Sequence, residues 1–283
     1  MHRLATSDFT DEILWINHNL EKVDRQAADV KHGLAMVPKV CDVHPISQAR
    51  VRQPLRDVDN LVLTQGKGVP VGGARAAAFA ANCEVFEPVI DAIAAFHGVI
   101  LVVSNPVDLM TRHLLINQPS LSPNRVMGLG TVVETSRLRF AIADRLRTKK
   151  HPRDIHAFAI GTHDENFVPI IQEPGFPVEL IESVRLEVAQ GAKRVKGTDQ
   201  ANPGATVFPI VEGCVSVIRA IATNTPTCLT VSVLDSGTED RLCYSLPCFV
   251  DGSGWKERDS SCVRQHAVQS QIDTCLNGLR AVL

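Results

Sequence analysis

Five polar residues come after apolar stretches of the chain and could together handle a small organic acid. They are Arg75, Asn105, Glu134, Arg137 and His163. An arginine can hold a carboxylate through two parallel hydrogen bonds. A histidine beside a carboxylate can donate and accept a proton near neutral pH. We therefore expect a site for a small carboxylate in which His163 transfers the proton.

Each of these residues also has an ordinary structural interpretation. A single histidine at a strand end is more often solvated or structural than catalytic. Arg137 lies three residues after Glu134, so the two could form only an ion pair at the start of a helix. Arg75 could be an exposed loop residue, and Asn105, which precedes Pro106, could simply form a turn. Catalysis requires a fold that brings all five together.

The elements that must position these side chains alternate between strand and helix in the first half of the chain. Apolar strands are predicted at 12–19, 60–68, 98–106 and 125–130, and helices at 22–36, 76–96 and 136–146. This alternation, with strands apolar on both faces, favours a parallel α/β sheet. Ligands of such sheets bind beyond the carboxyl ends of the strands, which is where the five polar residues fall.

The second half of the chain follows a different pattern. Segments 226–237 and 241–254 are predicted to form a longer antiparallel pair, flanked by helices at about 178–195 and 205–222. A last amphipathic helix presents one apolar face made of Val268, Ile272, Leu276 and Leu279. We place a domain boundary near residue 131, which divides the chain into residues 1–131 and 132–283.

Composition and charge exclude several classes of function. The 283 residues are 45% hydrophobic and carry a formal net charge of −2, which gives no electrostatic case for nucleic acid or an anionic membrane as partner. The longest apolar stretch, "GVILVV", is far too short to span a bilayer. None of the eight cysteines forms a CxxC or a zinc-like spacing with histidine. We expect no metal site and a reduced, cytoplasmic chain.

Several stretches resemble a known family. The chain resembles the lactate/malate dehydrogenases in the stretches "LVVSNPVDLMT", "NRVMGLGTVVETSRLRFAIADRL", "AIGTHDENFVPI", "VKGTDQANPGATVFPIVEG" and "LPCFVDGSGWKE". The resemblance implies a Rossmann-type parallel sheet in a dinucleotide-binding domain (1–131), followed by an α+β substrate and catalytic domain (132–283). It also implies reversible hydride transfer between a nicotinamide cofactor and a small 2-oxo or 2-hydroxy acid.

The resemblance further implies a role for each matching residue. His163 would pass the proton to and from the substrate oxygen, oriented by Glu134. Arg137 would grip the substrate carboxylate, and Arg75 would polarise the reacting carbonyl. Asn105 would contact both the substrate and the nicotinamide ribose. The substrate pocket would also include Thr206 and Val69, and the cofactor would be lined by Asn17, Gly66, Asn82, Val103 and Ser104.

Some features depart from the family's pattern on the cofactor side. The chain starts near the end of what would be the family's first helix, so we expect the first strand and the GxGxxG loop to be missing. The fold would then be an N-terminally truncated Rossmann-type sheet. Asn17 stands where the family often has an acid, which admits NADP as well as NAD.

Other departures concern the reaction and its substrate. Glu134 is one methylene longer than the family's usual aspartate and should orient the imidazole less well. Asp164 and Glu165 follow His163 and should raise its pKa. Val69 offers neither charge nor hydrogen bond at the position that separates lactate from malate enzymes. It therefore predicts monocarboxylic substrates, unless Lys67 supplies a charge.

Two functions remain open. The first is an oxidoreductase with a small 2-oxo or 2-hydroxy acid as its partner and with NAD, or NADP, as its cofactor. The second is a non-catalytic relative or a truncated gene product of the same family. The resemblance also implies a homo-oligomer, either a dimer or a tetramer.

Overall fold

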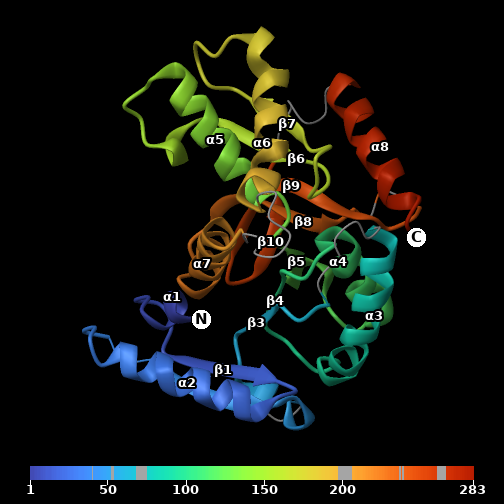
Figure 1. Cartoon of the computed structure of the whole chain (residues 1–283). Coiled ribbons are helices and arrows are strands. Elements are labelled where there is room, and N and C mark those ends of the chain that lie inside the picture. The colour runs from blue at the N-terminus through green and yellow to red at the C-terminus, as the bar shows by residue number, and fades with distance from the viewer. Residues whose placement is uncertain are drawn as a thin grey trace.

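The computed structural model of the chain is an α/β structure in which helices surround a central sheet (Figure 1). It describes residues 1–39, 41–51, 54–67, 75–196, 206–235, 237, 239–259 and 266–283. No helix among these residues is long and apolar enough to cross a membrane. The seven cysteines in the described part of the chain are all free thiols.

The N-terminal layer comprises a short helix, two parallel strands and the helix that connects the strands. Its elements are α1 (His2–Ala5), β1 (Glu12–Asn17), α2 (Leu20–Leu34) and β2 (Asp42–Ser47). The two strands pair in register from Glu12 with Asp42 to Asn17 with Ser47. The side chain of Asn19 caps α2 by accepting the Lys22 N–H at 2.9 Å, which satisfies a free amide of the first turn. This layer lies beside the main sheet as a separate two-stranded sheet (Figure 1).

The main sheet has six strands in the order β10-β9-β8-β5-β4-β3. Its parallel part is β3 (Asn60–Leu63), β4 (Val99–Val102) and β5 (Val126–Gly128). Its antiparallel part is β8 (Thr227–Leu234), β9 (Cys243–Asp251) and β10 (Gly254–Glu257). The helices that follow the three parallel strands are α3 (Arg75–Ala92), α4 (Val107–Asn117) and α5 (Val132–Leu146).

The two parts of this sheet meet at a seam between β5 and β8, where Gly128 pairs with Ser232. A Cβ on Gly128 would lie 2.6 Å from Thr111 Oγ1 and 3.0 Å from Ser232 Cβ. Only glycine therefore lets β5, β8 and α4 approach so closely. Strands from both sides of residue 131 thus belong to one sheet. The division into two domains at residue 131 stays a prediction.

A second two-stranded sheet and three helices complete the structure. Strands β6 (Ala157–Ile160) and β7 (Val168–Ile171) pair antiparallel. The helices are α6 (Ile181–Lys196), α7 (Phe208–Ala222) and α8 (His266–Arg280). Short 3₁₀ turns occupy Gln48–Arg50, Pro54–Asp57, Pro123–Arg125, Pro152–Asp154 and Val178–Leu180. The apolar face predicted for the last helix buries Ile272, Leu276 and Leu279, so that prediction is confirmed.

The two tryptophans lie in different sheets. Trp15 of β1 packs against the small core of the N-terminal layer, which includes Ala27 and Val43. Trp255 of β10 donates its indole N–H to the carbonyl oxygens of Pro123 at 2.9 Å and Val126 at 3.1 Å. Each tryptophan is therefore held by the layer to which it belongs.

Candidate active site

The fold brings most of the predicted site residues to the carboxyl ends of neighbouring strands. Asn105 follows β4, and Glu134 and Arg137 lie in the first turns of α5, which begins shortly after β5. His163 follows β6. Strands β4 and β5 are direct neighbours in the sheet. This placement agrees with the rule that parallel α/β sheets bind ligands beyond their carboxyl ends.

His163 and Glu134 form the central pair of the site. The Nδ1 atom of His163 lies 2.8 Å from Oε2 of Glu134. The Glu134 side chain is 8% exposed and that of His163 is 25% exposed, so the carboxylate is buried while the imidazole reaches solvent. Because the carboxylate holds Nδ1, the second nitrogen, Nε2, is available, and none of the described residues hydrogen-bonds it. Although glutamate is one methylene longer than the family's usual aspartate, its hydrogen bond to the imidazole has an ordinary length of 2.8 Å.

The charges around His163 favour its protonated form. Burial by itself lowers the pKa of His163, but the charge and hydrogen bond of Glu134 outweigh it and raise this pKa to about 9. Asp108 and Asp164 add smaller contributions in the same direction. The upward shift predicted from the sequence is confirmed, although Glu134 contributes more than Asp164.

Arg137 lies beside this pair. Its Nη1 atom is 3.5 Å from Glu134 Oε1, and its Nη2 donates to Thr206 Oγ1 at 3.4 Å. Both contacts are long, so the guanidinium keeps donors for a ligand. The stem of Arg137 packs against Gly191 of α6, where a Cβ would lie 3.4 Å from Arg137 Cδ. The ion pair expected from spacing alone is thus present, and it lies next to the imidazole.

Buried residues that were not predicted from the sequence hold the strand end before His163. The N–H of Gly161 donates to Ser245 O at 2.9 Å, and the N–H of Ser245 donates to Gly161 O at 2.7 Å. The N–H of His163 donates to Asp108 Oδ2 at 2.8 Å, and Ser232 Oγ donates to Asp108 Oδ1 at 2.6 Å. Asp108 lies in the "SNPVD" stretch, but an acid in the first turn of a helix is common for electrostatic reasons alone.

The loops after β3 and β4 are joined by residues predicted to line a cofactor. Asn82 Oδ1 accepts the N–H of Lys67 at 2.6 Å, and Asn82 Nδ2 donates to Asn105 O at 2.6 Å. Ser104 Oγ donates to Gln65 O at 2.5 Å. A Cβ on Gly66 would lie 3.2 Å from Asn82 Oδ1, so a side chain there would crowd Asn82. Asn82 and Ser104 therefore hold the two loops together, and their contact with a cofactor stays a prediction.

Two more residues predicted to line the cofactor, Val103 and Asn105, lie in the loop after β4. Val103 is half-buried, and the Asn105 side chain is exposed with no hydrogen bond to the rest of the described chain, so its amide can bind a ribose or a substrate. Asn17, at the end of β1, uses its Oδ1 to accept the Asn19 N–H at 2.9 Å. The glycines just before α3, Gly72 and Gly73, lie outside the described residues.

Two predicted substrate residues fall at or beyond the limits of the described structure. Val69 lies outside the described residues, and Arg75 begins α3 with a side chain that is not described. Lys67, the alternative source of charge to Val69, pairs its Nζ with Glu84 Oε2 of α3 at 2.9 Å, and both side chains are exposed. The charge of Lys67 is thus already paired outside the cluster around His163.

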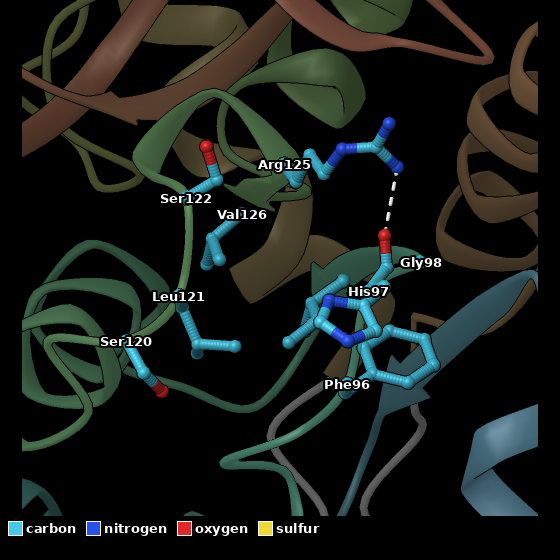
Figure 2. A pocket seen from close by; sticks show the side chains of 9 residues that line it. Phe96, His97, Gly98, Ser120, Leu121, Ser122, Arg125 and Val126 are labelled. Carbon is cyan, nitrogen blue, oxygen red and sulfur yellow. Dashed lines mark hydrogen bonds between the residues drawn. The ribbon is translucent and has the colours of Figure 1, made fainter.

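A recess of about 260 Å³ lies at the opposite end of β4 and β5. Figure 2 shows Phe96, His97, Leu121 and Val126 around it, and Arg125 donating to the His97 carbonyl oxygen, a bond of 2.8 Å. These residues precede or begin the two strands, whereas the cluster around His163 lies beyond their carboxyl ends. The recess is therefore separate from the acid–base site.

The fold and the site define an α/β protein with a Rossmann-type sheet and an imidazole–guanidinium pair around a buried carboxylate. Residues 1–128 match the family described as lactate/malate dehydrogenase, NAD binding domain. The chain is 30% identical over 260 residues to the L-lactate dehydrogenase of Gloeobacter violaceus, covering 86% of this chain and 76% of that protein. It is 30% identical over 269 residues to the L-lactate dehydrogenase of Bacillus caldotenax, covering 90% and 83% of the two chains.

Solved structures share the fold over the whole chain. A lactate dehydrogenase from a Medee basin deep-sea metagenome library has a TM-score of 0.85 at 24% identity, over 100% of this chain and 92% of that one. The malate dehydrogenase of Picrophilus torridus has a TM-score of 0.84 at 20% identity, over 99% and 91%. The chain belongs to the lactate/malate dehydrogenase family of oxidoreductases.

Proposed function

We propose that this chain reversibly reduces a small 2-oxo acid to the 2-hydroxy acid with a nicotinamide cofactor, and that His163 is the acid and base. The observation that carries this proposal is the 2.8 Å contact between His163 Nδ1 and Glu134, which leaves Nε2 available. A pKa of about 9 supplies a protonated imidazole at neutral pH, which is the form that reduction requires.

The residues of the chain divide the work of the reaction. The cofactor, when bound, supplies a hydride to the carbonyl carbon. His163 donates the proton on Nε2 to the carbonyl oxygen, so the product gains a hydroxyl group and the imidazole becomes neutral. Glu134 keeps the second proton on Nδ1 and holds the ring in place. In the reverse direction, the neutral imidazole removes the hydroxyl proton as hydride leaves the carbon.

Arg137 is the residue that we assign to the substrate carboxylate. Its long contacts with Glu134 and Thr206, 3.5 and 3.4 Å, leave its guanidinium able to make the paired bonds that a carboxylate prefers. The adjacent Thr206 hydroxyl can add a bond to the same ligand. We also assign Arg75 to the reacting carbonyl, from its place in the sequence alone.

The proposed substrates are monocarboxylic 2-oxo acids, pyruvate or larger. Val69 adds no charge for a second carboxylate, and Lys67 pairs with Glu84 at 2.9 Å. The test compares kcat/KM on pyruvate, 2-oxoisocaproate and oxaloacetate. We expect oxaloacetate to be the poorest and Val69→Arg to improve it. A wild-type preference for oxaloacetate that disappears in Lys67→Ala would assign substrate selection to Lys67 instead.

The cofactor is proposed to be NAD, with NADP as the alternative because Asn17 brings no charge to repel a 2′-phosphate. Calorimetric titration of NADH and NADPH, followed by turnover assays on the three oxo acids, tests activity and preference together. Binding of either dinucleotide without turnover on any 2-oxo acid would support the non-catalytic alternative. Such a result would contradict the proposed function.

We further propose a homo-oligomer, a dimer or a tetramer, in the cytoplasm. The proposal comes from the family resemblance and from the free thiols of the described cysteines. Sedimentation analysis over a range of protein concentrations tests the oligomer. A monomer at every concentration would overturn that part of the proposal.

A further inference from the structure

Asp108 is a buried carboxylate that the proposed mechanism does not use. It lies in the first turn of α4 and is 4% exposed. A carboxylate in such a position is costly unless its oxygens are hydrogen-bonded. Both are: Oδ2 accepts the backbone N–H of His163 at 2.8 Å, and Oδ1 accepts the hydroxyl of Ser232 at 2.6 Å.

These two bonds connect three parts of the chain. Asp108 lies three residues after Asn105, which we assign to the substrate and cofactor. Its partner Ser232 is fully buried in β8, at the seam where β8 pairs with Gly128 of β5. Its other partner is the peptide N–H of the proton-transfer residue. Asp108 therefore fixes the distance between the loop after β4 and the loop after β6.

The charge of Asp108 also acts on the imidazole. Burial raises the pKa of Asp108 to about 6, while the bonds from Ser232 and His163 oppose that rise and favour the carboxylate form. The titratable groups near Asp108 and His163 are Glu134 of α5, Asp164 and Cys243 of β9. Arg137 of α5 pairs with Glu134. Burial raises the pKa of the Cys243 thiol, so Asp108, Glu134 and Asp164 supply the negative charge.

We propose that Asp108 is a positioning residue for His163, which holds its backbone against the Asn105 loop and adds a second negative charge beside the imidazolium. The proposal rests on the proposed function, because positioning matters only if His163 transfers a proton. A structural role alone would require the buried carboxylate to be satisfied, but it would not require Asp108 to affect the titration of His163.

Two substitutions separate the hydrogen bond from the charge. Asp108→Ala removes both, whereas Asp108→Asn removes the charge and one of the two acceptors: its oxygen can still accept the His163 N–H, and its NH2 group then faces the Ser232 hydroxyl, which can accept from it. We expect kcat for oxo-acid reduction to fall by about tenfold or more in Asp108→Ala and to recover in part in Asp108→Asn. KM for the oxo acid should stay within about twofold in both, because Arg137 holds the substrate. The matched control is Asp91→Asn, an exposed aspartate of α3.

The titration of His163, followed by NMR, does not depend on turnover. The chain has ten histidines, and His163→Asn identifies the signal of His163 by its loss. Both Asp108 variants should lower the pKa of His163 by on the order of one unit, and Asp91→Asn should leave it unchanged. Lower thermal stability with an unchanged His163 pKa and kcat would overturn the proposal.

A further variant covers the case in which Asp108→Ala does not fold. Ser232→Ala keeps the Asp108 side chain and removes one of its donors, so it should raise the pKa of Asp108 and leave less of its negative charge at neutral pH. It should lower kcat less than Asp108→Ala does, because the bond to the His163 N–H remains. Wild-type protein without activity on any 2-oxo acid would contradict the proposed function, and the NMR titration would still show whether Asp108 acts on His163. If neither Ser232→Ala nor Asp108→Asn changed kcat or any titration, Asp108 would have no positioning role.

Discussion

The surroundings of His163 and the N-terminal layer differ in how firmly their residues are held. His163 is bonded through its ring to Glu134 and through its backbone to Asp108, and the preceding Gly161 is bridged to Ser245. In the N-terminal layer, β1 has no fully buried residue and β2 has Val43 alone. The two strands pair only with each other among the described residues.

This difference separates two parts of the proposed function. The acid–base site is fixed by several hydrogen bonds from α4, α5, β8 and β9, so its geometry should survive changes in the N-terminal layer. Asn17, one of the residues predicted to line the cofactor, belongs to that less buried layer. Proton transfer and cofactor affinity should therefore respond to different mutations.

The largest expected effect is that of His163→Asn. Removing the proton donor should lower kcat by on the order of 10³-fold, while the affinity for NADH changes little because Asn105 and the loops after β3 and β4 are untouched. Steady-state kinetics and calorimetry measure the two quantities in the same preparation. Turnover within tenfold of wild type would remove His163 from the mechanism.

Glu134→Gln should have the next largest effect and should also change the pH profile. With His163 at a pKa of about 9, oxo-acid reduction should stay level up to about pH 9 and then fall, because it needs the imidazolium. Hydroxy-acid oxidation needs the neutral imidazole, so it should rise until about pH 9. Glutamine removes the main charge that raises this pKa. The pH at which reduction begins to fall and the pH at which oxidation stops rising should therefore both be lower, and kcat should fall on the order of a hundredfold. If these two pH values stayed the same in pH–rate profiles, Glu134 would not set the pKa of His163.

Arg137→Lys should act mainly on substrate binding. An ammonium cannot form the two parallel bonds of a guanidinium, so KM for the oxo acid should rise about tenfold to a hundredfold. The NADH affinity is the internal control and should stay constant. An unchanged KM would place the carboxylate elsewhere in the site.

The smallest expected effect is a difference in hydrogen exchange between the N-terminal layer and the main sheet of the unmutated protein. Backbone amides of β1 and β2 should exchange with solvent at least about tenfold faster than those of β8 and β9, because few of their side chains are buried. Hydrogen–deuterium exchange measures all four strands in one sample. Equal protection would mean that the N-terminal layer is as stable as the main sheet.

The sequence predicted the alternation of strands and helices because its strands are apolar and bounded by polar turns. It predicted β4 from "GVILVV" and the antiparallel pair β8 and β9 from their long apolar runs, and both are confirmed. It could not show that β1 and β2 form a sheet of their own, because strand pairing depends on partners distant in the chain. The pairing of β6 with β7 was missed for the same reason.

The candidate site was predictable where a residue's own chemistry suggests its role. His163 follows a strand, Glu134 and Arg137 lie in the first turns of the helix after a strand, and the structure places the three together. Ser232 and Ser245 gave no comparable signal, because a serine within an apolar strand is compatible with many surroundings. Gly191 lies in the middle of a helix, where an isolated glycine often marks close packing, and here it contacts Arg137.

The placement of the two tryptophans gives the protein a built-in pair of optical reporters. Trp15 lies in the N-terminal layer and Trp255 at the far edge of the main sheet, so their intrinsic fluorescence reports on different layers. In Trp15→Phe the emission comes from Trp255 alone, and in Trp255→Phe it comes from Trp15 alone. Emission spectra recorded during denaturant titration can therefore follow the loss of each layer separately, without any added dye.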